Sequence, residues 1–459
     1  MANTMAAQAS AILYQNPQRD ITVIDVPTSI ALALRIPGDF LSAKAPNEPH
    51  PDTNAPKSQK AKAKCKTNTV DGVLHANYKS DIESALEEVR KHVKSCWCFP
   101  RQVMHQTPKP AGRKTENSGM EVDDPEEALS RQLRKWSEEE EKDDDFATMM
   151  AKLSMGVDFD TPNWVMSYAP LGKDGKADQG SGSLPDQQTI EEPLATCFHN
   201  PREAPLDITI RDPAFSEQGR SFRFRIPPRS TFFLKDINHA EAFRHEFRTI
   251  TEEHKLPRHF DFVVLDPPWP NHSARRKAGY APAVSNKALA EMILKLDLDT
   301  YLEHNAIVGI WVTNKQSVRD VVLGKRGIFE KLNVGFIEEW IWVKTTSKGE
   351  FISEIDSLWR KPYEVLLLGR AAPDAVTKMQ AAEPIKRRTI FGVPDFHSRK
   401  PCLKELIEPY MPDTDYTALE VFARHLVAGW SSLGNEVLKY NWEGYWASGS
   451  IEDSRLLSP

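Results

Sequence analysis

The sequence predicts an α/β protein in which a mostly parallel sheet, covered by helices on both faces, follows a smaller N-terminal region of mixed structure. After about residue 206, short apolar segments alternate with segments whose apolar residues recur at helical spacing, which is typical of such sheets. The first 200 residues lack this regular alternation. The chain has 459 residues, a length that suggests about two or three domains.

The N-terminal region, residues 1–205, shows a patchy pattern. Ser80 and Glu83 have the spacing of a capping box, and apolar residues then recur at helical spacing. Biased composition, rich in Pro and Lys or in acids, predicts flexible linkers. The expected elements are strands at 21–26 and 30–36, a helix at 80–93, and linkers at about 42–68 and 100–145.

The remaining chain divides into a small β-rich segment at 206–250, a domain at 251–447 that holds the parallel sheet, and a tail at 448–459. Apolar and polar residues alternate at 206–210 and 222–226, which favours strands. In the larger domain, apolar strand candidates are 262–265, 306–312, 336–343, 363–368, 389–393 and 418–422, and helical patterns lie at 285–304, 316–332 and 403–410.

Charge is distributed unevenly. The chain carries a net charge of -6, but residues 116–145 hold 13 acids and 4 bases, so removing them leaves +3 for the rest. This segment is either a solvated linker or an acidic tether that competes with nucleic acid for a basic groove. The lysine-rich stretch at 57–66 is either a linker or a nuclear-import or phosphate-binding patch. The negative sum therefore does not exclude a nucleic-acid ligand.

Other classes are disfavoured. We find no apolar run of about 18 residues, so no membrane span is expected. The first 20 residues lack the basic start and long apolar stretch of a secretory signal. The five cysteines form no C-x-x-C pair, which favours reduced intracellular thiols. Near residues 261–271, histidines and cysteines do not occur at the spacing of metal ligands, so no metal is expected.

The clearest chemical signal is the sequence DFVVLDPPWPN at 261–271, in which an apolar strand ends at Asp266, Pro267, Pro268 and Trp269. Proline donates no backbone hydrogen bond and holds the preceding residue extended. The prolines therefore stop the strand and form a rigid shelf that bears a carboxylate, free carbonyls and an indole. Ligands of such sheets bind at the carboxyl ends of strands.

A primary amine on a flat ring fits this shelf. The carboxylate and a carbonyl can each accept one amine hydrogen, which draws the nitrogen lone pair into a nucleophilic geometry, while Trp269 lines or stacks on the ring. The exocyclic amine of adenine is such a group. A Pro-Pro turn with a half-buried tryptophan is the structural alternative.

The Asp-Pro-Pro-Trp segment resembles the catalytic signature of the eukaryotic adenine-N6 methyltransferases, typified by the messenger-RNA methyltransferase. The resemblance covers roughly residues 206–442. It extends through WVTN at 311–314, EWIWVK at 339–344, KPYE at 361–364, KP at 400–401, LEVFAR at 419–424, GW at 429–430 and GNE at 434–436.

The resemblance implies a Rossmann-like domain that uses S-adenosylmethionine and transfers its methyl group directly to adenine N6. It implies that Asp266 and the Pro267 carbonyl orient the target amine, and that Trp269 lines the base pocket. The residues implied to bind the cofactor are Asp236, Ile237, Asp266, Lys400, Phe422, Arg424, Asn435 and Glu436. Of these, Lys400 would pair with the cofactor carboxylate.

Basic residues beside the shelf suit a nucleic-acid backbone, although ordinary solvated charge is the alternative. Lys361 and Glu364 either shape the base pocket or only pair with each other, and Trp340 and Trp342 favour core packing over base stacking. The expected substrate-binding residues are Trp269, Asn271, Arg275, Arg276, Lys277, Lys344, Lys361 and Glu364.

Three functions stay open at this point. The first is an RNA adenine-N6 methyltransferase, and the KPYE and GNE variants resemble a branch of the family that implies 2′-O-methyladenosine in small nuclear RNA. The second is the same reaction on DNA. The third is an inactive RNA-binding subunit, although such subunits usually lose the acidic signature that is intact here. A monomer and a nuclear location, with a possible cytoplasmic pool, are favoured, and no protein partner is indicated.

Overall fold

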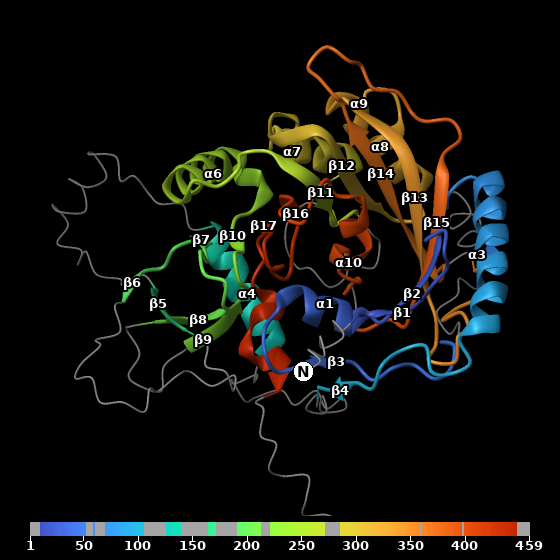
Figure 1. Ribbon diagram of the computed structural model, residues 1–459, viewed down its shortest axis with the longest axis horizontal. Helices are drawn as coiled ribbons and strands as arrows, with labels where there is room; N and C mark the ends of the chain where they lie inside the picture. The colour runs from blue at the N-terminus through green and yellow to red at the C-terminus, as the bar shows by residue number, and fades with distance from the viewer. Residues whose placement is uncertain are drawn as a thin grey trace, which may run out of the picture. The chain divides into compact units, whose positions relative to one another are not determined.

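The computed structural model describes residues 10–51, 58–59, 69–104, 125–138, 164–170, 191–212, 221–270, 285–357, 360–396 and 399–447. The chain divides into two compact units, and their helices and strands are labelled in Figure 1. Unit 1 comprises Met1–Ala33, Ser42–Arg101 and Ala240–Phe422, and unit 2 comprises Leu34–Leu41, Gln102–His239 and Ala423–Pro459. These units do not follow the expected segment boundaries at 205 and 250, since N-terminal residues belong to both.

Unit 1 is built on a large sheet that is mostly parallel. Its strand order is β1 (Ile12–Gln15), β2 (Ile21–Ile24), β15 (Lys386–Gly392), β13 (Val334–Lys344), β14 (Tyr363–Ala371), β12 (Leu302–Val312), β11 (Phe260–Leu265) and β16 (Ala418–Val421). Strand β11 runs parallel to both β12 and β16, whereas β14 is antiparallel to both of its neighbours. The expected strands in this region are confirmed, and the sheet gains β2 through its parallel pairing with β15.

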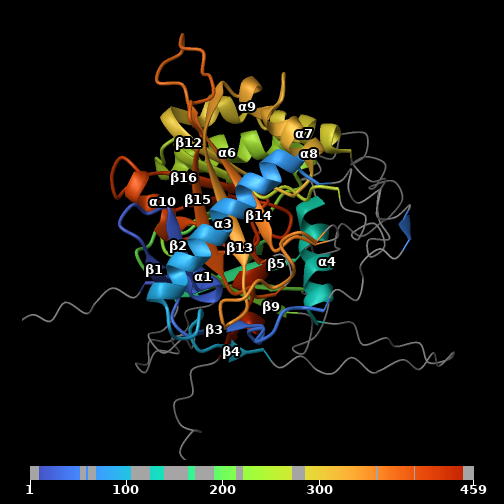
Figure 2. The same cartoon turned by 90° about the vertical axis from the view of Figure 1, so that its right-hand side faces the viewer.

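Helix α3 (Gly72–His92) connects the N-terminal residues to this sheet. It contacts β13, β15 and β2, and Figure 2 shows it lying across these strands. Its Tyr78 hydroxyl donates to Glu339 of β13 over 2.7 Å. Arg319 and Arg387 also pair with this buried carboxylate, as a charge withdrawn from water requires. The helix begins after Asp71, whose side chain accepts from the Val73 and Leu74 amides, so the prediction of a start at Ser80 is wrong.

Several expected helices are shorter in the structure. Residues 285–304 contain α7 (Asn286–Leu294) and then a 3-10 turn before β12 begins. Residues 316–332 divide into α8 (Gln316–Leu323) and α9 (Ile328–Lys331). Glycines at 324 and 327 lie at the break, where an added Cβ on Gly324 would be 2.3 Å from the Asp320 carbonyl oxygen.

The strand predicted at 30–36 is wrong, because helix α1 (Val26–Leu34) covers most of these residues.

The C-terminal part of unit 1 supplies the remaining short helices around the sheet. Helix α6 (Ala240–His254) precedes β11 and buries Phe243, Phe247 and Ile250 along one face, which is the spacing of an amphipathic helix. Helix α10 (Lys404–Ile407) and a 3-10 turn occupy the expected helix at 403–410. No helix in the described ranges combines the length and apolar character that a membrane crossing needs.

Unit 2 contains an antiparallel sheet of β6 (Glu192–Pro193), β5 (Val165–Pro170), β8 (Leu206–Arg211) and β9 (Ser221–Ile226). The strands expected at 206–210 and 222–226 are thereby confirmed. A second group pairs β10 (Thr231–Phe233) with β17 (Ser431–Leu433) in parallel and with β7 (Cys197–His199) in antiparallel. Two-residue strand β18 (Trp446–Ala447) pairs with β3 (Asp39–Ser42).

Helix α4 (Pro125–Glu138) corrects the expectation of a flexible linker throughout 100–145. It buries Leu129, Leu133 and Trp136, which recur at helical spacing and so share one face. Trp136 packs edge-on against Trp164 and Phe222, within the hydrophobic core of unit 2. The linker was predicted because the segment is rich in acidic residues, and the apolar face of the helix was overlooked.

Candidate active site

The shelf predicted from the sequence lies at the carboxyl end of β11. Strand β11 ends at Leu265, and the Asp266 amide donates to the Val421 carbonyl over 3.3 Å, which continues the alignment with β16 for one residue. Because β12 and β16 run parallel to β11, the carboxyl ends of all three strands meet at one edge of the sheet. Asp266 therefore lies where open α/β sheets bind ligands.

Trp269 is a fixed wall of this shelf. Its side chain is 6% exposed, and its indole Nε1 donates to the Trp311 carbonyl oxygen over 2.7 Å. Its backbone amide donates to the Pro267 carbonyl over 2.8 Å. That carbonyl retains a second lone pair that can accept from a ligand. The geometry matches a pocket lining better than an open stacking platform.

Lys400 binds the catalytic carboxylate candidate on both oxygens. Its Nζ lies 2.7 Å from Oδ1 and 2.7 Å from Oδ2 of Asp266, and 3.4 Å from Oε2 of Glu364. The Lys400 ammonium also lies 5.3 Å from the centre of the Trp311 ring, a favourable cation–π distance. The structure thus pairs two predicted site residues, Asp266 and Lys400, with each other.

Four side chains of alternating charge form a cluster in the order Lys344, Glu364, Lys400 and Asp266. Glu364 accepts from Lys344 over 2.5 Å and faces Lys400 on its other oxygen. Burial by itself would raise the pKa of Glu364, but the ammonium groups of Lys344 and Lys400 outweigh it and hold the pKa at about 2. Glu364 is therefore an ionised carboxylate that fixes two lysines, one of which reaches Asp266.

Lys361 has a different partner from the one considered in the sequence. Its Nζ lies 3.1 Å from Nε2 of His75 in α3, so the alternative of a Lys361–Glu364 pair is wrong. His75 also bonds the Tyr363 hydroxyl over 2.7 Å and Asp356 over 3.1 Å. Desolvation lowers the pKa of Lys361 and of His75. No local pattern in the sequence could have connected residues 75 and 361.

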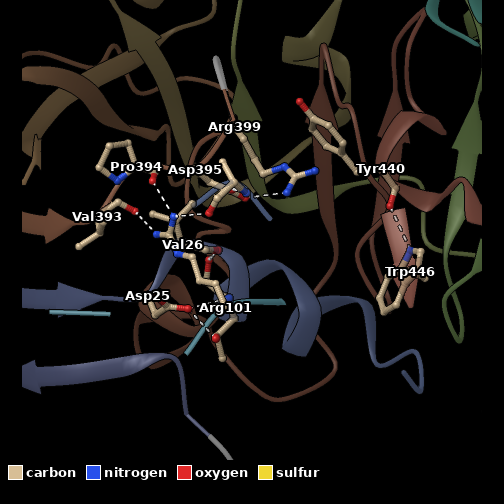
Figure 3. Close-up of polar contacts among 12 residues, drawn as sticks. Asp25, Val26, Arg101, Val393, Pro394, Asp395, Arg399, Tyr440 and Trp446 are labelled. Atoms are coloured by element: carbon tan, nitrogen blue, oxygen red, sulfur yellow. Dashed lines mark hydrogen bonds and ion pairs between the residues drawn. The ribbon is translucent and has the colours of Figure 1, made fainter. Parts of the chain in front are cut away.

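The segment that leads to Lys400 is held by two arginines, Arg101 and the buried Arg399, as Figure 3 shows. Arg101 donates to the carbonyl oxygens of Val393 and Pro394 over 2.8 Å and 2.9 Å. Arg399 lies 2.6 Å from Asp395, and both side chains are buried. These contacts fix the backbone next to Lys400, which positions its ammonium at Asp266.

Phe422 directly follows β16 and has a φ of 64°. A bulky residue in the left-handed region is a genuine conformational outlier, and such outliers cluster at functional sites. The sequence predicted Phe422 as a cofactor residue without any indication of this backbone conformation.

The remaining predicted cofactor residues lie in unit 2. Asn435 Nδ2 donates to Oδ2 of Asp236 over 3.3 Å, and Ile237 beside it is buried. Glu436 is 7% exposed. Three cations surround its carboxylate: Arg134, which donates to Oε1, and Arg424 and Lys439, which lie 3.6 Å and 3.9 Å from Oε2.

Some predicted residues fall outside the described ranges, namely Asn271, Arg275, Arg276 and Lys277. Trp340 and Trp342 are buried in the core, as expected. Sequence reasoning missed two residues that contact predicted site residues: His75 in α3, which contacts Lys361, and Arg134 in α4, which contacts Glu436. Within the ranges that the structure covers, no cluster of three potential metal ligands is present.

Part of this chain is similar to known methyltransferases. Residues 260–436 match the MT-A70 family model. The chain is 40% identical over 221 residues to the "N6-methyladenosine RNA methyltransferase MTA1" of Cryphonectria parasitica, a match that covers 48% of this chain and 61% of that protein. It is 34% identical over 230 residues to the "N(6)-adenine-specific methyltransferase METTL4" of Homo sapiens, covering 49% and 45%.

A third relative is the "DNA N6-methyl methyltransferase" of Caenorhabditis elegans, 29% identical over 227 residues that cover 49% of this chain and 56% of that protein. The chain spans about half the length of these relatives. Methyltransferases of the MT-A70 family generally use S-adenosylmethionine. The matched segment contains Asp266, Lys400 and Phe422, and over residues 260–436 this chain is similar to the MT-A70 family.

Proposed function

We propose that this chain transfers a methyl group from S-adenosylmethionine to N6 of adenine in RNA. The observation that carries the proposal is the position of Asp266, at the carboxyl edge of β11 and paired with Lys400, inside an MT-A70 segment. The relative from Cryphonectria parasitica, by its name an N6-methyladenosine RNA methyltransferase, supports RNA as the substrate class.

The donor and acceptor groups fit the cofactor. Lys400 carries the cation that a carboxylate group needs. Asn435 and Glu436 offer an amide donor and carboxylate acceptors for ribose hydroxyls, with Arg424 beside them. Asp236 and Ile237 offer a polar acceptor and an apolar surface for the adenine. When bound, S-adenosylmethionine supplies an activated methyl group on a positively charged sulfur.

The protein contributes mainly by orienting the amine. One Asp266 oxygen and the Pro267 carbonyl each accept a hydrogen from N6, which directs the nitrogen lone pair out of the ring system. Lys400 contacts both Asp266 oxygens in this structure, and each oxygen keeps a second lone pair that can accept from the amine. Trp269 limits the position of the base from a fixed wall.

For the substrate, we propose that Lys344, Lys361 and Glu364 line the base pocket, and that Asn271, Arg275, Arg276 and Lys277 contact the base and the phosphate backbone. The finer assignment, 2′-O-methyladenosine in small nuclear RNA, is supported by the KPYE and GNE segments. DNA adenine is the second candidate, because a relative from Caenorhabditis elegans is named for that activity.

The same proposal includes a Rossmann-like layout for the sheet around β11, supported by the parallel pairing of β11 with β12 and β16. A nuclear location is proposed from the lysine-rich stretch at 57–66 and from the substrate class. We also propose that the chain acts as a monomer.

The substrate proposal is tested by incubating the full chain with S-adenosylmethionine and matched RNA and DNA oligonucleotides, with and without a 2′-O-methyl on the target adenosine. Nucleoside mass spectrometry then quantifies N6-methyladenine. We expect transfer to RNA, greatest when the target is 2′-O-methylated. Preferential transfer to DNA would favour the second candidate. Cofactor binding without transfer to any oligonucleotide would favour an inactive RNA-binding subunit.

A further inference from the structure

Helix α4 packs into the hydrophobic core of unit 2 through apolar side chains, and its charged side chains are not part of that core. Leu129, Leu133 and Trp136 are fully buried, and the ring centre of Trp136 lies 4.9 Å from that of Trp164. The exposed face of the helix carries most of its acidic and basic residues. Removing one exposed charge should therefore leave the helix docked.

One of these charged residues reaches a proposed cofactor residue. Arg134 is more than half exposed, yet its guanidinium hydrogen-bonds the nearly buried carboxylate of Glu436. Arg424 and Lys439 lie farther from that carboxylate, at 3.6 Å and 3.9 Å. Arg134 thus hydrogen-bonds Glu436 directly.

Two further contacts connect α4 to the same group. Glu126, in the first turn of α4, lies 3.2 Å from Nζ of Lys439, and Lys439 also faces Glu436. At the other end of the helix, the Ser137 carbonyl accepts from the Asp236 amide over 3.4 Å. Helix α4 therefore contacts the surroundings of both Glu436 and Asp236, which were assigned to the cofactor.

We propose that Arg134 is a positioning residue for cofactor binding, acting through Glu436. Burying a carboxylate such as that of Glu436 costs free energy unless a counterion lies beside it. The planar guanidinium of Arg134 also restricts the rotamers of the Glu436 side chain. Arg134 holds the Glu436 carboxylate in the orientation in which its free lone pairs accept from the ribose hydroxyls. Helix α4 thereby contributes a structural part of the proposed cofactor site. This inference rests on the proposed function.

The test is equilibrium binding of S-adenosylhomocysteine to the full chain by isothermal titration calorimetry. Arg134→Ala is expected to weaken binding by about tenfold, as for the loss of one charge-assisted hydrogen bond that is partly screened by solvent. Arg134→Lys keeps the charge without the planar fork and should recover part of the affinity. Lys135→Ala, at the neighbouring exposed position, is the matched control and should bind like the unaltered chain.

A double-mutant cycle separates positioning from a general structural effect. If Arg134 acts through Glu436, then Arg134→Ala should add little to the loss caused by Glu436→Gln. Thermal unfolding of each variant shows whether it is folded. If Arg134→Ala does not fold, the affinity of Arg134→Lys is compared with that of the unaltered chain instead. Unchanged affinity in Arg134→Ala, or full additivity with Glu436→Gln, would overturn the inference alone. Failure of the unaltered chain to bind would contradict the proposed function and, with it, this inference.

Discussion

The ammonium of Lys400 lies 2.7 Å from each carboxylate oxygen of Asp266. One lysine thus contacts both oxygens of the carboxylate proposed to orient the target amine, and each oxygen keeps a second lone pair. Glu364, on the other side of Lys400, is itself fixed by Lys344. The contacts with Lys400 hold the Asp266 carboxylate in one orientation before any ligand binds, which is the kind of preorganisation that stabilises a transition state.

Replacement of Lys400 should impair both cofactor binding and transfer. In Lys400→Met the side chain keeps its length but loses the charge, so Asp266 loses its counterion and, under the proposed assignment, the cofactor carboxylate loses its partner. We expect cofactor affinity to fall by about tenfold or more, measured by calorimetry with S-adenosylhomocysteine. The control is Lys378→Met at an exposed position of unit 1; an equal loss in the control would argue against a specific role.

Glu364 should make stability depend on pH in the acid range. Its pKa is lowered from 4.5 in an unfolded chain to about 2 in the fold, so its contribution is fully present above about pH 4.5 and is lost as pH falls toward 2. The difference corresponds to a stabilisation on the order of 3 kcal/mol. Denaturant unfolding of the unaltered chain and Glu364→Gln should converge over this range. A constant difference between them would contradict the assignment.

The anchor of α4 should be important for stability. Trp136→Ala removes a fully buried indole from the core of unit 2, and such truncations cost about 3–5 kcal/mol. The expected result is a lower denaturation midpoint in circular dichroism, together with weaker cofactor binding. Val376→Ala, at a side chain that is 92% exposed, should leave the midpoint unchanged. A similar midpoint for both variants would mean that α4 does not contribute to the fold.

The shelf could be predicted from sequence because its determinants are local. An apolar strand, two prolines and a tryptophan specify where β11 stops, and backbone chemistry follows from those residues alone. The alternation of strands and helices likewise predicted the sheet that carries Asp266. The antiparallel orientation of β14 was not predicted, since the periodicity of a strand is the same in either direction.

Contacts between distant segments could not be predicted from a single sequence. Arg134 and Glu436 are separated by 302 residues, and His75 and Lys361 by 286. Such pairs form only because tertiary packing brings two helices against the sheets of their units. Helix α4 was missed because acidic composition outweighed three apolar residues at helical spacing, which shows that burial pattern is more informative than charge for a short helix.

The central claim is that Asp266 orients the target amine. The most direct measurement is single-turnover formation of N6-methyladenine in RNA by Asp266→Ala and by Asp266→Asn, each with a melting curve and a calorimetric measurement of cofactor binding. We predict that both variants stay folded, that the alanine variant has no detectable transfer, and that the asparagine variant is slower by at least about 100-fold. Transfer by Asp266→Ala at the rate of the unaltered chain would contradict the account.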